Sequence, residues 1–212
     1  MLAFVTLGTL ATLVSAYLPG APVVGRSAML RVVQPSSVRC QEASETLVPK
    51  MESSCAFDFV PLQIALATGE FRDADQLTRD ALITLAGPNA LSRGYVYFTE
   101  APKLPVEDMA TIERLWQTYS KGKWGYSVQR QAFLSKKVNR QFEPLFERLG
   151  WKNRGGSLLR WLPEAKGDEF IYSAEAPKGH LPLTSTLRGT QLLSGLLEHE
   201  AWQLDEFKGV QF

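Results

Sequence analysis

The sequence is poor in the residues that build metal sites and disulfide frameworks. Its 212 residues include only two cysteines and two histidines. Neither Cys40 nor Cys55 has a partner at the spacing of zinc ligands, so we predict no intrinsic metal. Because Cys40 lies in or beside a segment with the composition of a targeting sequence, the mature chain keeps one thiol and no disulfide framework. The sequence also lacks an Asn-x-Ser/Thr glycosylation site, and both absences argue against secretion.

Signatures of catalysis are missing as well. No serine stands in a Gly-x-Ser-x-Gly turn. The segment Gly122-Lys123-Trp124 lacks the upstream glycine and the downstream Ser or Thr of a phosphate-binding loop. His199-Glu200 starts like the helix of a zinc protease, but Gln203 occupies the position of the second histidine. The sequence therefore predicts a protein that is not an enzyme.

Net charge is nearly absent, yet the charges are unevenly distributed. The 23 Lys and Arg residues against 22 Asp and Glu leave a net charge of +1, so no basic field favours nucleic acid as a partner. No acidic residue occurs before Glu42, and the only charged side chains up to that point are Arg26, Arg31 and Arg39. The first part of the chain is therefore a different kind of polypeptide from the rest.

This N-terminal part resembles a targeting sequence in two segments. Residues 2–14 are uncharged and apolar or small, and they are fewer than the roughly 20 residues that span a bilayer. Val14-Ser15-Ala16 suits a signal-peptidase site, so we predict a signal peptide over residues 1–16 and a transit-peptide-like segment over residues 17–44. This order resembles the bipartite presequences of algae whose plastids lie inside extra membranes. A secreted protein with a flexible pro-segment is the alternative.

Helical periodicity dominates the remaining chain, and strand-like alternation is almost absent. After a linker over residues 45–58, the pattern predicts helices over residues 60–68, 73–85, 105–122, 128–139, 142–150 and 184–204. Asp73 and Ser127 are the expected N-caps of the second and fourth of these helices. Residues 151–176 are irregular, with a turn or short hairpin expected around Trp161. We predict one all-α domain, large enough to bury a core without disulfides or metals.

Three segments of this domain carry a resemblance to a known family. Residues 111–129 read T-I-E-R-L-W-Q-T-Y-S-K-G-K-W-G-Y-S-V-Q. Together with Leu149-Gly150-Trp151 and with residues 176–182, A-P-K-G-H-L-P, this segment resembles the Genomes-Uncoupled-Four family of tetrapyrrole-biosynthesis regulators. The resemblance extends over residues 59–197, and residues 67–75 fit the first helical hairpin of the family.

The resemblance implies both a fold and a function. The fold is a small multi-helix domain, likened to a cupped palm with a porphyrin-binding cleft, over residues 59–204, followed by a C-terminal tail over residues 205–212. The function is binding of protoporphyrin IX or Mg-protoporphyrin IX and stimulation of magnesium chelatase through its large porphyrin-binding subunit, in chlorophyll biosynthesis and retrograde signalling in the plastid. A contact with the plastid membrane surface is a further expectation. The alternative is a helical protein-interaction module of the plastid that has lost porphyrin binding.

The resemblance also implies where the porphyrin binds. The positions that match the loop overhanging the porphyrin are Phe170, Ser173, Ala176, Lys178, Gly179, His180, Leu181 and Pro182. Two further aromatic residues, Trp151 and Trp161, are expected in the apolar floor of the site.

The sequence departs from the family pattern at the opposite lip of the site. Pro88 follows Gly87, where the family usually has an Arg and then a Trp, so Arg93 and Tyr95 are the candidate substitutes. Within the loop itself, Lys178 stands where Arg is common, and Ser173 stands where Asn is common.

Overall fold

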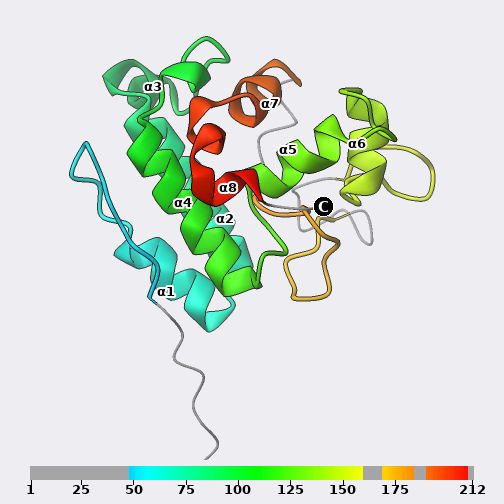
Figure 1. The fold of residues 1–212 in the computed structure, drawn as a ribbon, viewed down its shortest axis with the longest axis horizontal. Coiled ribbons are helices and arrows are strands. Elements are labelled where there is room, and N and C mark those ends of the chain that lie inside the picture. Colours follow the sequence, from blue (N-terminus) through cyan, green and yellow to red (C-terminus); the bar gives the residue numbers. More distant parts are fainter. Residues whose placement is uncertain (1–47, 160–168, 184–189, 210–212) are drawn as a thin grey trace, which may run out of the picture. The chain divides into compact units, whose positions relative to one another are not determined.

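The structure of the protein is a computed structural model that describes residues 48–159, 169–183 and 190–209. The chain divides into two units, residues 1–45 and 46–212, and the description below concerns the second. The expected targeting segments therefore lie outside the described residues. Every regular element within the described ranges is a helix (Figure 1), which confirms the predicted all-α fold. None of these helices combines the length and the apolar character that crossing a membrane requires.

The helices alternate with short turns along the chain. In chain order they are α1 (Val60–Thr68), α2 (Phe71–Leu85), α3 (Pro88–Arg93), the 3-10 turn η1 (Ala101–Lys103), α4 (Val106–Ser120), α5 (Tyr126–Leu134), α6 (Phe142–Arg148), α7 (Thr190–Leu197), the 3-10 turn η3 (Glu200–Gln203) and α8 (Asp205–Lys208). The single helix expected over residues 184–204 is wrong in its C-terminal part, because the chain turns between α7, η3 and α8. Its first residues, 184–189, lie outside the described ranges.

The first two helices form the expected antiparallel pair. Pro61 stands in the first turn of α1, where its missing N–H removes no helical hydrogen bond. Gly69 ends α1 in the left-handed conformation, with φ at 80°. The expected cap at Asp73 is wrong, because α2 already begins at Phe71 and Asp73 lies in its first turn. An acidic residue there still interacts favourably with the N-terminal end of the helix dipole.

Helix α4 occupies the centre of the domain and packs against α1 and η3. The predicted stripe on this helix is largely buried, since Met109, Ile112 and Trp116 have no exposed surface. The indole N–H of Trp116 donates to the hydroxyl of Thr78 on α2, 2.9 Å away. This bond satisfies a polar group that the core would otherwise leave unpaired.

The start of α5 differs from the prediction. Ser127 is not the N-cap, because α5 begins at Tyr126 after Gly125. The buried carboxylate of Glu113 on α4 takes the place of a local cap. It accepts from the N–H groups of Tyr126 at 2.7 Å and of Ser127 at 3.2 Å, and from the Ser127 hydroxyl at 2.6 Å. A side chain from the preceding helix therefore satisfies the first amides of α5.

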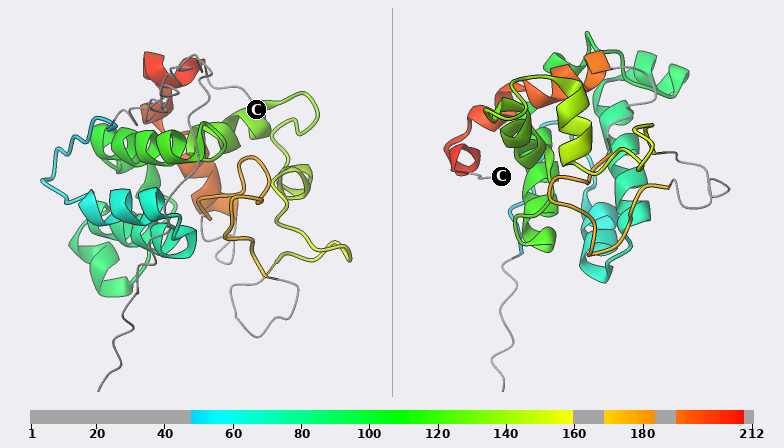
Figure 2. Two further views of the ribbon diagram at one scale, coloured as in Figure 1. Left: turned by 90° about the horizontal axis from the view of Figure 1, so that it is seen from below. Right: turned by 90° about the vertical axis from the view of Figure 1, so that its right-hand side faces the viewer.

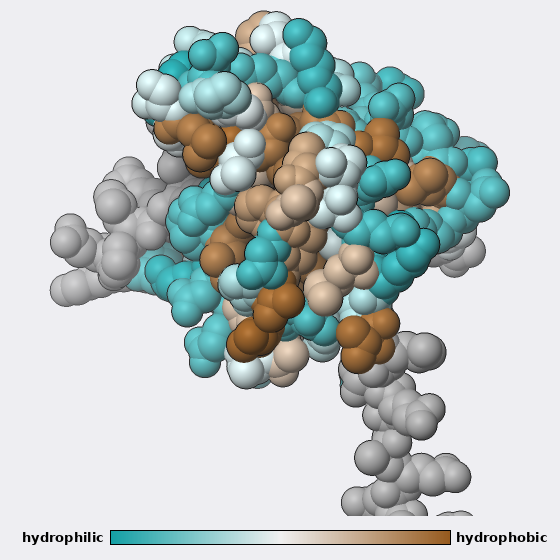
Figure 3. All heavy atoms as spheres, turned by 90° about the vertical axis from the view of Figure 1, so that its left-hand side faces the viewer, coloured by the Kyte–Doolittle hydropathy of each residue, from teal (hydrophilic) through white to brown (hydrophobic). Residues whose placement is uncertain are grey.

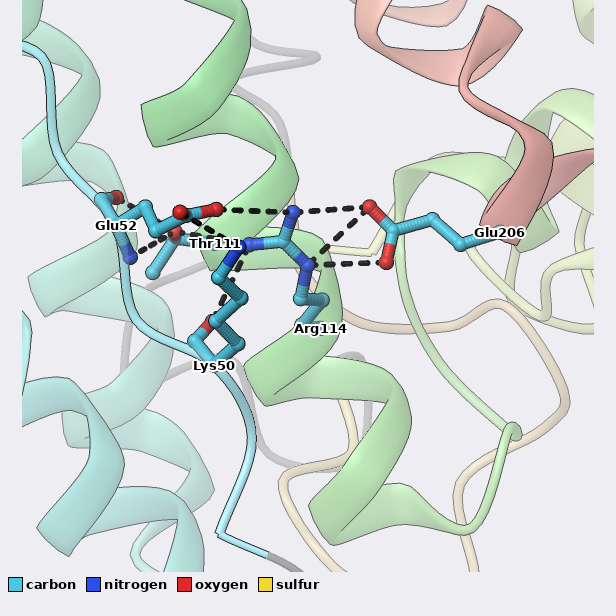
Figure 4. A network of polar contacts seen from close by, with 5 residues as sticks. All are labelled: Lys50, Glu52, Thr111, Arg114 and Glu206. Carbon is cyan, nitrogen blue, oxygen red and sulfur yellow. Dashed lines mark hydrogen bonds and ion pairs between the residues drawn. The ribbon is translucent and has the colours of Figure 1, made fainter.

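Arg114 of α4 ties both ends of the described chain to the centre of the domain (Figure 4). Its guanidinium pairs with the carboxylate of Glu206 on α8 at 2.9 Å and lies 3.9 Å from that of Glu52. It also donates to the main-chain oxygen of Lys50 at 3.2 Å. Residues 205–208, expected as part of a C-terminal tail, are thus helical and attached to the core.

Some apolar side chains remain at the surface. On α1, Leu62 and Leu66 are buried, whereas Val60 and Ile64 are exposed. On the face of the molecule drawn in Figure 3, hydrophobic residues reach the surface in separate groups among hydrophilic ones.

Candidate functional site

The candidate site is built around the segment of residues 169–183, called here the 169–183 loop, which is drawn in orange in Figure 1. The turn between α4 and α5 holds this loop through main-chain bonds. The N–H of Gly179 donates to the oxygen of Lys123 at 2.9 Å, and the N–H of Gly125 donates to the oxygen of Leu181 at 3.1 Å. The indole N–H of Trp124 donates to the oxygen of Pro177 at 3.0 Å. Residues of the long family motif therefore fix the backbone of the loop.

Gln129 of α5 provides a second attachment. Its buried amide nitrogen donates to the oxygen of Gly179 at 3.0 Å and to that of Pro182 at 2.8 Å. Both carbonyls belong to a segment without regular secondary structure, where buried backbone oxygens need partners from elsewhere. One side chain thus holds two points of the loop at a fixed separation.

His180 joins the loop to the end of α6. Its Nδ1 lies 2.7 Å from the oxygen of Leu149, and its Nε2 accepts from the N–H of Ile171 at 3.1 Å. Because Nε2 accepts, the proton is on Nδ1 and the ring is neutral. Burial lowers the pKa of His180, which favours the same state. Both ring nitrogens are engaged, so His180 has none to offer the metal of a porphyrin.

Aromatic rings form a buried support beneath the loop. The ring of Trp151 stacks on that of Phe146 with centroids 5.7 Å apart, and Phe170 meets Trp151 edge-on at 6.5 Å. The indole N–H of Trp151 also donates to the oxygen of His180 at 2.9 Å. Trp151 and Phe170 are both buried. Trp161, the other residue expected in the floor, lies outside the described residues.

The remaining predicted loop residues divide by exposure. Ala176, Gly179, His180, Leu181 and Pro182 are buried, Lys178 is half-buried and Ser173 is exposed. The structure therefore brings most of the predicted residues together in one loop that hydrogen bonds hold in place. Their contact with a porphyrin stays a prediction, and only the solvent-exposed side of this loop is accessible to a ligand.

A cleft of about 530 Å³ opens beside this loop. Its apolar lining includes Leu159 and Ile171, and Ile171 is 40% exposed. Lys152 and Arg154 line the same cleft. Lys152 pairs with Glu143 and, at 3.6 Å, with Glu147, whereas the described residues give Arg154 no ion pair.

This cleft has a mixed lining, in which Glu169 joins the apolar and the basic residues. Its volume falls in the range of small-molecule sites, roughly 300–1,000 Å³. Exposed apolar atoms can cover a flat apolar ring, and a cation at the rim can face carboxylate side chains. In the described ranges, no group of three or more His, Cys, Asp and Glu side chains is placed to hold a metal ion.

Arg93 and Tyr95 lie at a different place. Arg93 is the last residue of α3, which follows the C-terminal end of α2. It pairs with Glu100 at 2.6 Å and stacks over Tyr97, with its guanidinium carbon 4.3 Å from the ring centroid. Tyr95 lines a hollow of about 300 Å³ together with residues of α7. The 169–183 loop instead contacts the N-terminal end of α2, where Arg72 lies over the Tyr172 ring. Figures 1 and 2 agree that α3 and the loop lie apart.

The length of α2 separates the two predicted lips. Its 15 residues span about 22 Å at about 1.5 Å per residue. The described contacts therefore do not bring Arg93 and Tyr95 to the cleft beside Ile171.

Sequence reasoning missed the residues that fix the loop. Gln129 is the last residue of the quoted family motif and Asp75 ends the quoted first-hairpin segment, yet neither was singled out. Asp75 is buried on α2 and accepts from the N–H of Leu183 at 2.6 Å. A polar residue at a core position of a helical stripe was the available signal, since buried polar groups need partners.

Together these features define a helical domain in which a loop held by hydrogen bonds borders a cleft lined by apolar, basic and acidic residues. The chain belongs to the GUN4-like family, whose sequence model matches residues 52–200. This confirms the family indicated by the motifs.

Individual relatives agree with this assignment. The chain is 42% identical over 156 residues to the ycf53 protein of Porphyra purpurea, covering 74% of this chain and 62% of that protein. It is 41% identical over 154 residues to the chloroplastic tetrapyrrole-binding protein of Arabidopsis thaliana, covering 71% of this chain and 57% of that protein. The chain thus spans less than two thirds of the length of these relatives.

A solved structure shares the fold. The structure of GUN4 from Chlamydomonas reinhardtii superimposes with a TM-score of 0.66 at 39% identity, over 74% of this chain and 97% of that one.

Proposed function

We propose that this protein is a non-catalytic tetrapyrrole-binding protein of the plastid that binds protoporphyrin IX or Mg-protoporphyrin IX and stimulates magnesium chelatase. The observation that carries the proposal is the cleft bordered by Ile171 and Arg154 beside a loop whose backbone is fixed from the α4–α5 turn, from α5 and from the end of α6. The name of the Arabidopsis relative supports the ligand class. A fixed loop favours binding because less ordering is needed when the ligand arrives.

Apolar contact supplies most of the expected affinity. A porphyrin that buries about 400 Å² of apolar surface gains roughly 10 kcal/mol at about 25 cal/mol per Å². Association and side-chain ordering cost about 4–15 kcal/mol, which leaves a modest net affinity. An exposed ion pair between Arg154 or Lys178 and a propionate adds about 0.2–1 kcal/mol. The apolar walls therefore set affinity, and the cations set the orientation of the ring.

A titration with protoporphyrin IX tests the ligand and the cleft together. Binding is expected to shift the Soret band and to quench tryptophan emission. Ile171→Asp, which puts a charge on the apolar wall, is expected to weaken binding about tenfold. Ile64→Asp is the matched control, because Ile64 is also exposed, at 57%, but lies on α1. Equal affinity of the two variants would remove the cleft from the proposal, and no spectral change in the parent protein would remove the ligand.

The effect on magnesium chelatase needs a separate assay. Adding the protein to the chelatase, with its large porphyrin-binding subunit present, is expected to increase the rate of magnesium insertion. A protein that binds this subunit without any Soret change is instead the interaction module that has lost its ligand. An unchanged rate with a bound porphyrin contradicts the stimulating role alone.

The plastid location rests on residues 1–44. Fused to a fluorescent reporter in an alga whose plastid has extra membranes, these residues are expected to direct the reporter into the plastid. Export of the reporter to the medium supports the secreted alternative.

A further inference from the structure

Asp75 connects α2 to the C-terminal end of the 169–183 loop. Its side chain has no exposed surface, and its Oδ1 accepts a hydrogen bond of 2.6 Å from the N–H of Leu183, which lies 108 positions further along the chain. The other bonds described above hold the loop from the α4–α5 turn, α5 and the end of α6. Asp75 therefore supplies the attachment of this loop end to the first helical hairpin.

The carboxylate of Asp75 is only partly compensated. Its Oδ2 lies 3.4 Å from the guanidinium of Arg79 and accepts no hydrogen bond within the described part of the chain. Among the described residues, the titratable and charged groups that interact with it are Arg79 of its own helix and Tyr172 of the loop, and Arg72 in turn acts on Tyr172. Arg72 lies over the Tyr172 ring, 4.6 Å from its centroid.

Burial raises the pKa of Asp75 to about 7, although Arg79 and the Leu183 N–H act in the opposite direction. Burial also raises the pKa of Tyr172 to about 12, and the nearby Asp75 charge adds to this effect. Tyr172 thus stays neutral throughout the range in which Asp75 gains or loses its proton. A buried, ionised carboxylate whose charge is only partly compensated destabilises the folded protein. We therefore look for the role of Asp75 in its hydrogen bond to the Leu183 amide.

We propose that Asp75 is a positioning residue for the tetrapyrrole site: its carboxylate, through the amide of Leu183, fixes the end of the 169–183 loop against α2, and protonation of that carboxylate loosens the loop and weakens ligand binding. This inference rests on the proposed function. Its physical basis is that a hydrogen bond to an ionised acceptor is roughly twice as strong as one to a neutral acceptor. The affinity for the porphyrin is expected to fall about fivefold between pH 8 and pH 6.

The attachment itself can be tested without any ligand. In the full chain, the carboxyl carbon of Asp75 and the amide proton of Leu183 are followed by NMR between pH 5.5 and pH 8.5. Both signals are expected to titrate with one common midpoint near neutrality. A Leu183 amide that stays unchanged while Asp75 titrates overturns the proposal, and so does a carboxyl signal that already titrates below pH 5.

Ligand binding supplies the second test. The Asp75→Asn side chain keeps an oxygen that can accept from Leu183 but cannot ionise. The affinity of this variant for protoporphyrin IX is divided by the affinity of the parent protein at the same pH, so that any effect of porphyrin protonation cancels. This ratio is expected to be about fivefold higher at pH 6 than at pH 8. Asp80→Asn is the matched control, an exposed aspartate on the same helix, and its ratio is expected to stay constant. A constant ratio for Asp75→Asn refutes the role in binding.

Failure of this inference is distinct from failure of the proposed function. If the parent protein binds no porphyrin at any pH, the proposed function fails, and with it the role of Asp75 in binding. The NMR titration still decides whether Asp75 holds the loop.

Discussion

Substitution of Gly125 by alanine should strongly destabilise the protein, because the site has neither the conformation nor the space for a side chain. Gly125 has φ at 142°, and a Cβ atom there would overlap Oε1 of Glu113. That carboxylate cannot move freely, since it accepts from Tyr126, from Ser127 and from the side-chain amide of Gln117 at 2.7 Å.

Two contributions set the expected loss in the free energy of unfolding. Backbone strain costs about 1–3 kcal/mol, and displacing a buried carboxylate leaves donors unpaired at about 1–3 kcal/mol each. A loss of about 4 kcal/mol is therefore expected, which corresponds to a drop in Tm of about 8–16 °C for a domain of this size. Because the N–H of Gly125 also holds Leu181, porphyrin affinity should fall under conditions in which the variant is still folded.

Urea unfolding followed by tryptophan fluorescence measures this loss. Gly69→Ala is the control, because Gly69 also has a positive φ, of 80°, but a Cβ there meets nothing within 4 Å. It should cost only about 1–2 kcal/mol. In a Glu113→Ala background, the added cost of Gly125→Ala should shrink to the strain alone. If Gly125→Ala is no more destabilising than Gly69→Ala, the steric argument is wrong.

Three further predictions concern charged side chains. Lys178→Ala should weaken porphyrin binding by a few-fold and Lys178→Glu by more, and the difference between the two variants should shrink at high salt. Equal affinity of Lys178→Glu and the parent protein at low salt would exclude a contact between Lys178 and a propionate. The pKa of Asp75 is about 7 in the fold against 3.8 ordinarily, so between pH 4 and 7 the fold holds a proton that the unfolded chain has lost, and stability falls as the pH rises. Asp75→Asn should remove that slope and raise the free energy of unfolding at pH 8 by at most about 4 kcal/mol, as urea titrations at each pH can show. Arg114→Ala should lower stability by about 2 kcal/mol and speed hydrogen exchange in residues 48–54 and 205–208; unchanged exchange in both segments would contradict the attachment drawn in Figure 4.

The helices could be predicted where local signals in the sequence decide their bounds. The bounds of the helix over residues 60–68 follow from Pro61 and Gly69, and both act locally. The N-cap at Asp73 was wrong because α2 begins two residues earlier, at Phe71. The N-cap at Ser127 was wrong because the group that accepts from the first amides of α5 lies on another helix. The start of α5 depends on Glu113, which lies on the preceding helix and is 14 positions away from Ser127. Such a partner cannot be read from a local pattern of residues.

The candidate site was predictable as a group of residues but not as an arrangement. The motifs drew attention to Trp151, to His180 and to the loop around them, and the structure brings these residues together. Their polar groups bind the backbone of the chain, however, and the cleft is lined by Ile171 and Arg154, which no motif indicated. Periodicity and motif spacing indicate which residues are buried and which lie close together. Which side of a loop faces solvent depends instead on tertiary contacts, and these cannot be read from the sequence pattern.

The difference between buried and exposed residues accounts for where the sequence departs from the family pattern within the 169–183 loop. A buried loop without regular structure must pair its main-chain groups, so residues such as Gln129 and Trp151 that pair them cannot change without leaving a polar group unsatisfied. The departures inside the loop fall at exposed Ser173 and half-buried Lys178. A substitution there changes the surface presented to a ligand and leaves the hydrogen bonds beneath it intact. The same framework can therefore hold loops with different outer residues, and the preference among porphyrins should depend on those outer residues.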